Sequence, residues 1–92
     1  MRPSSLSIVL ILLASSLGAS AANAQGDACS RLWVQRNQIY KDNGFCFKTE
    51  RAISYFGNAG CQYDYEGDVP LTRGERARIA RIIADERSLG CR

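Results

Sequence analysis

Four cysteines and a short run of carboxylates are the residues whose types and spacing bear most directly on chemistry. The chain of 92 residues contains no histidine, so the usual base of a nucleophilic triad is missing. Asp64, Glu66 and Asp68 alternate along one segment, and Glu75 follows further on. A pair of carboxylates is therefore the one acid and base chemistry that this composition leaves open.

The same acidic segment has the spacing of a calcium-binding EF-hand loop, but its sixth position is Val69 and Pro70 follows. Because glycine at that position makes the loop's sharp turn, we interpret the acids as a solvated loop. The cysteines are 17, 15 and 30 residues apart and form no Cys-x-x-Cys pair, which zinc sites typically use. The sequence therefore predicts no metal site and no cofactor.

The amino terminus has the pattern of a secretory signal peptide. Arg2 precedes an uncharged aliphatic run over residues 6–17, and Ala22-Asn23-Ala24 is a small-x-small pattern suited to signal peptidase. We expect cleavage after Ala24, so that residues 1–24 are the signal peptide and residues 25–92 form a single domain. The apolar run would span only about 18 Å of a roughly 30 Å hydrocarbon core. We therefore predict a periplasmic or extracellular protein with no transmembrane anchor after cleavage.

Residues 27–43 are expected to form the first of three helices, because apolar positions recur there every three or four residues. These positions are Leu32, Trp33, the stem of Arg36, Ile39 and Tyr40. Asp27 or Ser30 can cap the start of this helix, and Gly44 ends it.

Two shorter helices are expected further along. Thr49 can cap a helix that ends at Gly57, with one face made of Ala52, Ile53 and Phe56. Residues 57–71 are mostly loop. Thr72 and Glu75 then match a capping box, which predicts the start of a third helix. Its buried stripe comprises Ile79, Ile82, Ile83 and Leu89.

Glu86 falls within the apolar stripe of the third helix, where an unpaired carboxylate would be costly. We predict a buried ion pair with Arg36, which lies on the apolar side of the first helix. This pair would act as a brace, with Tyr40 in the core and Gly44 as the helix stop.

The domain left after cleavage has 68 of the 92 residues, too few for core burial alone to provide much stability. Cys29, Cys46, Cys61 and Cys91 all lie in it, which favours two disulfides in an oxidising compartment. Cys29 cannot pair with Cys46, because the helix between them would hold their α-carbons about 20 Å apart. We favour Cys29–Cys91 with Cys46–Cys61, and Cys29–Cys61 with Cys46–Cys91 is the alternative. The fold class predicted is a mainly all-α, three-helix domain with irregular connections.

Several patterns together resemble the YARHG domain family over residues 32–86. They are the stretch RNQIYKDNGFCF over residues 36–47, Tyr55-Phe56, Leu71-Thr72-x-x-Glu75, and Ile79-x-x-Ile82-x-x-x-Glu86. Tyr40 and Gly44 stand as in the family, whereas Lys41-Asp42-Asn43 replaces Ala-Arg-His. The resemblance implies a small helical extracellular or periplasmic bacterial domain and no known reaction.

We predict a non-catalytic binding module of the bacterial envelope, not an enzyme, whose partner is an envelope protein or peptidoglycan. Tyr63 and Tyr65 are the candidate contact residues. The arginines of the third helix scatter around it, so no nucleic acid partner is expected. The alternatives are a hydrolase of envelope glycan, with Asp64 and Asp68 across a cleft, and a secreted inhibitor.

Overall fold

The computed structural model describes the backbone of residues 5–91 and the side chains of residues 24–91, so the positive residue Arg2 lies outside the described residues. The described part is helical, and it contains no named strand. Its elements are α1 (Ser5–Asp42), α2 (Glu50–Phe56), the 3-10 helix η1 (Glu66–Asp68) and α3 (Arg73–Ser88). This confirms the predicted all-α class with three α-helices.

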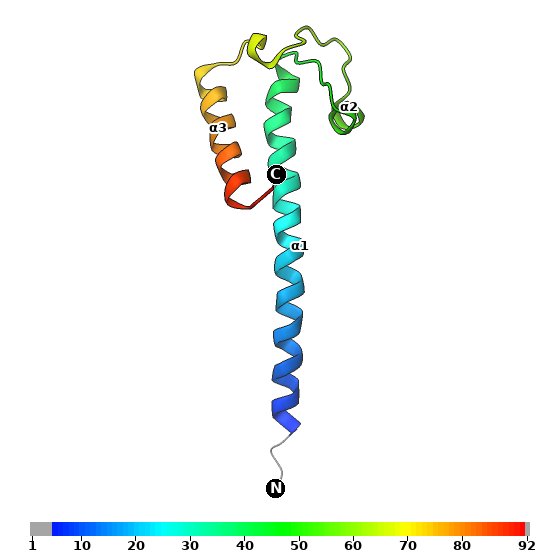
Figure 1. The fold of residues 1–92 in the computed structure, drawn as a ribbon, viewed down its shortest axis with the longest axis vertical. Helices are drawn as coiled ribbons and strands as arrows, with labels where there is room; N and C mark the ends of the chain where they lie inside the picture. Colours follow the sequence, from blue (N-terminus) through cyan, green and yellow to red (C-terminus); the bar gives the residue numbers. More distant parts are fainter. Residues whose placement is uncertain (1–4, 92) are drawn as a thin grey trace.

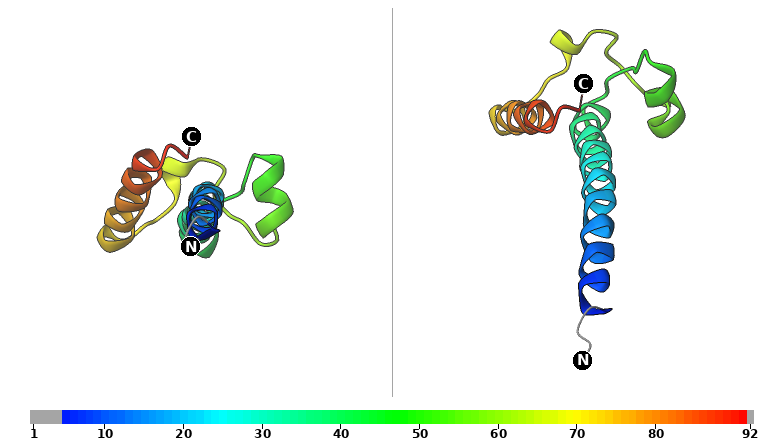
Figure 2. Two further views of the ribbon diagram at one scale, coloured as in Figure 1. Left: turned by 90° about the horizontal axis from the view of Figure 1, so that it is seen from below. Right: turned by 60° about the horizontal axis from the view of Figure 1, so that its bottom comes forward.

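α1 lies between the other two helices. α3 runs antiparallel to it on one side and α2 packs on the other (Figure 1). A view along α1 shows the same order from below (Figure 2, left). The first half of α1 extends beyond both neighbours, so the packed domain is built around its second half.

α1 begins earlier than predicted. It is one continuous helix from Ser5 to Asp42 that passes through the expected cleavage site at Ala24, so neither Asp27 nor Ser30 caps its start. The physical reason is that residues 5–42 contain no proline, and leucine and alanine, which favour helix, are frequent among them. Among the described residues, no helix combines the length and the apolar character needed to cross a membrane.

The end of α1 agrees with the sequence. Gly44 adopts φ +88°, a left-handed conformation that favours glycine and stops the helix. The next segment, Phe45 to Phe47, is extended and forms an isolated parallel bridge to Tyr63. The Asn58 side chain completes this pairing, since its Oδ1 accepts from Phe47 N at 2.7 Å and its Nδ2 donates to Phe47 O at 3.0 Å.

The core consists of two adjoining clusters. Ile39 of α1 packs against Ile79 and Ile82 of α3 in one of them. The other lies toward α2 and contains Phe45, Phe47, Ala52 and Val69. Tyr40 and Leu71 contact both clusters, so the two halves of the domain pack as one unit.

Thr72 and Glu75 form the predicted capping box at the start of α3. In α2 the cap at Thr49 is also present, but Ile53 is 43 % exposed. The expectation that Ile53 belongs to the buried face is wrong, because a helix of seven residues that packs on α1 at one edge buries little beyond Ala52.

Both favoured disulfides are present, Cys29–Cys91 and Cys46–Cys61, with α-carbons 5.4 Å and 5.1 Å apart. The first ties the end of the chain to α1, and the second ties the extended segment to the loop that follows α2. Gln25 adds a contact near the first disulfide, because its side-chain amide donates to the carbonyl of Leu89 beyond α3.

Candidate functional site

A cleft of about 460 Å³ lies between α1, α2 and the loop before η1. Its walls combine aromatic, amide and charged side chains from segments far apart in the sequence. The lining residues are Trp33, Arg36, Asn37, Phe45, Phe47, Lys48, Thr49, Ala52, Asp64, Tyr65 and Glu66. A mixed lining of this volume is typical of a site for a small molecule or a short polymer segment.

Buried aromatic residues make the floor of this cleft. Phe47 is 3 % exposed, and its ring lies 5.2 Å from that of Phe45 and 5.1 Å from that of Phe56. Disulfide Cys46–Cys61 ties this segment to the loop that follows α2. The floor is therefore fixed by packing and by a covalent tie before any ligand arrives.

The outer rim of the cleft is polar and exposed. Lys48 Nζ lies 3.0 Å from Asp64 Oδ1, and both side chains are largely in solvent. Tyr65 lines the cleft together with its neighbours Asp64 and Glu66, and its side chain is 72 % exposed. An exposed aromatic beside fixed polar groups is a usual composition for a contact surface.

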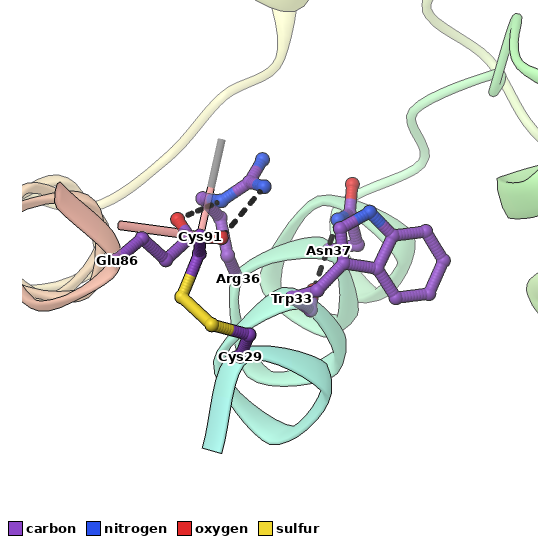
Figure 3. Close-up of polar contacts among 6 residues, drawn as sticks. All are labelled: Cys29, Trp33, Arg36, Asn37, Glu86 and Cys91. Atoms are coloured by element: carbon purple, nitrogen blue, oxygen red, sulfur yellow. Dashed lines mark hydrogen bonds and ion pairs between the residues drawn. A yellow bond between two sulfur atoms is a disulfide. The ribbon is translucent and has the colours of Figure 1, made fainter. Parts of the chain in front are cut away.

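Arg36 and Glu86 form the predicted brace between α1 and α3. Arg36 Nε donates to Glu86 Oε1 at 2.8 Å and Nη2 donates to Oε2 at 3.1 Å, a bidentate geometry that favours guanidinium over ammonium. Glu86 is 2 % exposed. Figure 3 shows the Arg36 side chain standing between Glu86 on one side and Trp33 with Asn37 on the other.

A second hollow, of about 430 Å³, adjoins the cleft and shares Trp33 and Arg36 with it. Disulfide Cys29–Cys91 and Glu86 line its inner side. Arg51 of α2 lines its outer side, where its guanidinium carbon lies 3.7 Å from the centre of the Trp33 ring. The two hollows therefore meet over one tryptophan and one arginine of α1.

Burial raises the pKa of the Tyr40 phenol, and the nearby negative charge of Glu66 raises it further. The pKa of Glu75 is lowered, first by the hydrogen bond from the Thr72 backbone and then by the one from the Asn43 side chain. Both groups are thereby explained by packing and helix capping, so neither points to catalysis.

The structure separates the two tyrosines expected at the surface. Tyr65 is exposed and lines the cleft, but Tyr63 is half-buried against the second core cluster. A β-carbon added at Gly44 would lie 3.3 Å from the Tyr63 ring, which shows how closely that ring covers the backbone. The prediction that Tyr63 is an exposed contact residue is wrong, because the bridge to Phe45 turns it inward.

The acidic residues of the loop also separate. Asp64 and Glu66 line the cleft, whereas Asp68 does not, so the structure does not bring Asp64 and Asp68 together across it. In residues 24–91, no three acids or cysteines lie close enough to one another to hold a metal ion.

Three residues that line the hollow or support the floor of the cleft were not predicted from the sequence. Arg51 gave no signal beyond its charge, because its contact with Trp33 depends on how α2 packs against α1. Asn58 and Val69 lie in a segment interpreted as loop, yet Val69 is 2 % exposed. The one sequence signal that could have indicated the burial of Val69 is its apolar side chain between Asp68 and Pro70, two residues that favour turns.

The fold and the two hollows define a small, disulfide-linked helical domain with a preformed cleft. A family model described as the YARHG domain matches residues 7–87, and the chain belongs to the YARHG domain family. That match starts earlier than the resemblance found over residues 32–86. No curated protein and no solved structure matches the chain. The family and the two disulfides are consistent with an exported protein.

Proposed function

We propose that this protein is an exported, non-catalytic binding module whose cleft holds a segment of peptidoglycan. The signal-peptide pattern over residues 1–24 and the oxidised cysteines support a location in the periplasm or outside the cell. Peptidoglycan is the polymer that such a protein meets there in quantity.

The observation that carries the proposal is the cleft itself. Its volume of about 460 Å³ lies within the range of about 300 to 1,000 Å³ that holds small ligands. A folded protein partner would instead need a contact surface of roughly 800 Å² per partner. The exposed ring of Tyr65 suits the face of a sugar ring, and the amide of Asn37 and the charged rim suit its hydroxyls and the attached peptides.

Binding without catalysis fits the carboxylates of the cleft. Asp64 is paired with Lys48, and Glu66 is the other acid in the lining. Asp68, which was paired with Asp64 in the alternative of a glycan hydrolase, lies outside the lining. The proposal therefore assigns the acids to the polar rim.

Co-sedimentation with purified peptidoglycan sacculi tests this function. The protein is expressed as the full chain and recovered in oxidised form from the periplasm. We expect saturable binding that weakens several-fold in Tyr65→Ser. Ile53→Ser is the control, because Ile53 is also an exposed apolar side chain, at 43 %, but does not line the cleft. Absence of sedimentation with sacculi, or equal losses in both variants, would overturn the proposal.

A further inference from the structure

We infer that the hollow beside the cleft binds a carboxylate of the ligand, and that Arg36 and Arg51 are the residues that hold it. This inference rests on the proposed function and deepens it, because it names the chemical group by which the polymer is recognised. The carboxylates in question are those of the peptides attached to the glycan strands.

Arg36 is held in place for such a contact. Glu86 accepts hydrogen bonds from its Nε and Nη2, which fixes the plane of the guanidinium. The two hydrogen bonds to Glu86 do not use Nη1, and the Arg36 side chain as a whole is 17 % exposed. A fixed guanidinium with donors left over is suited to a carboxylate.

Arg51 supplies the second cation from the opposite wall. Its guanidinium lies over the Trp33 ring at 3.7 Å, so a long exposed side chain is held at the mouth of the hollow by a cation–π contact. Trp33 and Arg36 are both in the lining with it. The two guanidinium groups thus face one space from α2 and from α1.

The balance of charge separates the two hollows. The hollow is lined by Arg36 and Arg51 against Glu86, which leaves one positive charge in excess. The cleft is lined by Arg36 and Lys48 against Asp64 and Glu66, which cancel. An acidic group therefore gains most in the hollow, while an uncharged part of the same ligand lies in the cleft beside Tyr65.

Sedimentation with two forms of sacculi tests the inference. They are untreated sacculi and sacculi whose carboxylates have been converted to amides. We expect about tenfold weaker binding to the amidated form, as for the loss of a charge-assisted hydrogen bond. Equal binding to untreated and amidated sacculi would overturn this inference and leave the proposed function standing, whereas no binding to any form would overturn both.

Variants locate the contact. Arg51→Gln is expected to bind untreated sacculi about tenfold more weakly, with a melting temperature only a few degrees lower, because an exposed side chain loses one cation–π contact. Arg81→Gln removes the same charge from the exposed face of α3, outside both hollows, and is expected to bind like the parent protein. Equal affinity of Arg51→Gln and the parent, or an equal loss in Arg81→Gln, would overturn the assignment.

Discussion

Replacing Glu86 by leucine tests whether the brace between α1 and α3 is an ion pair that depends on both partners. Leucine has a similar volume but no charge, so Arg36 would keep its place against α3 without a counter-ion. Removal of one partner from a buried pair destabilises a protein by about 3 to 5 kcal/mol. Because Arg36 is 17 % exposed, part of its charge can reach water, and we expect the lower end, about 3 kcal/mol.

A loss of this size is large for so small a domain. At about 4 to 8 °C per kcal/mol for 60 to 100 residues, the midpoint of thermal unfolding would fall by about 12 °C or more. The double variant Arg36→Met/Glu86→Leu removes both charges and fills the space with apolar groups. Such replacements are often neutral or stabilising, so the double variant is expected to lie within about 1 kcal/mol of the parent.

Urea denaturation of the oxidised protein, followed by circular dichroism, measures both values. A loss below about 1 kcal/mol in Glu86→Leu would contradict a buried brace, since the pair would then behave like a surface ion pair. A double variant as unstable as the single one would also refute it, because the loss would then arise from packing.

Three further predictions concern the two disulfides and two titratable groups, Tyr40 and Glu75. Replacing Cys29 and Cys91 by serine should lower the free energy of unfolding by about 4 kcal/mol, because that disulfide closes a loop of 62 residues. Replacing Cys46 and Cys61 by serine should lower it by about 3 kcal/mol, because the loop has 15 residues. Equal losses in the two variants would contradict the larger effect of the longer loop. Spectrophotometric titration should show one tyrosine that ionises above the usual value of 10.0, and this step should vanish in Tyr40→Phe. Because the pKa of Glu75 is lower in the folded state, its contribution to stability is present above about pH 4.5 and is lost as the pH falls through the lower folded value. Glu75→Gln should therefore flatten the decline of the melting temperature in acid, and an unchanged decline would contradict it.

The helices that carry strong local signals could be predicted from the sequence. The capping box at Thr72, the stop at Gly44 and the misplaced charge at Glu86 each have a cause within a few residues or within one helical face. For the disulfides, helix geometry excluded one pairing and left two open. The structure, in which α1 and α3 are antiparallel, shows the favoured one, Cys29–Cys91 with Cys46–Cys61.

The cleft could not be predicted, because it depends on tertiary contacts without a local pattern. Tyr63 and Tyr65 look alike in sequence, yet Tyr63, which is bridged to Phe45, is half-buried and Tyr65 is exposed. Arg51 reaches Trp33 only through the packing of α2. The start of α1 was mispredicted for a different reason. Asp27 and Ser30 could cap a helix only if it began there, but the residues before them are helical as well.

The most direct measurement is a titration of the ¹⁵N-labelled, oxidised protein with soluble peptidoglycan fragments that contain both sugars and peptide. We predict saturable chemical-shift changes at the Trp33 indole N–H, at Arg36 Nε–H and at the Tyr65 amide. No change on addition of the fragments, or changes confined to the outer face of α3 around Arg81, would contradict a binding site in the cleft and the hollow beside it.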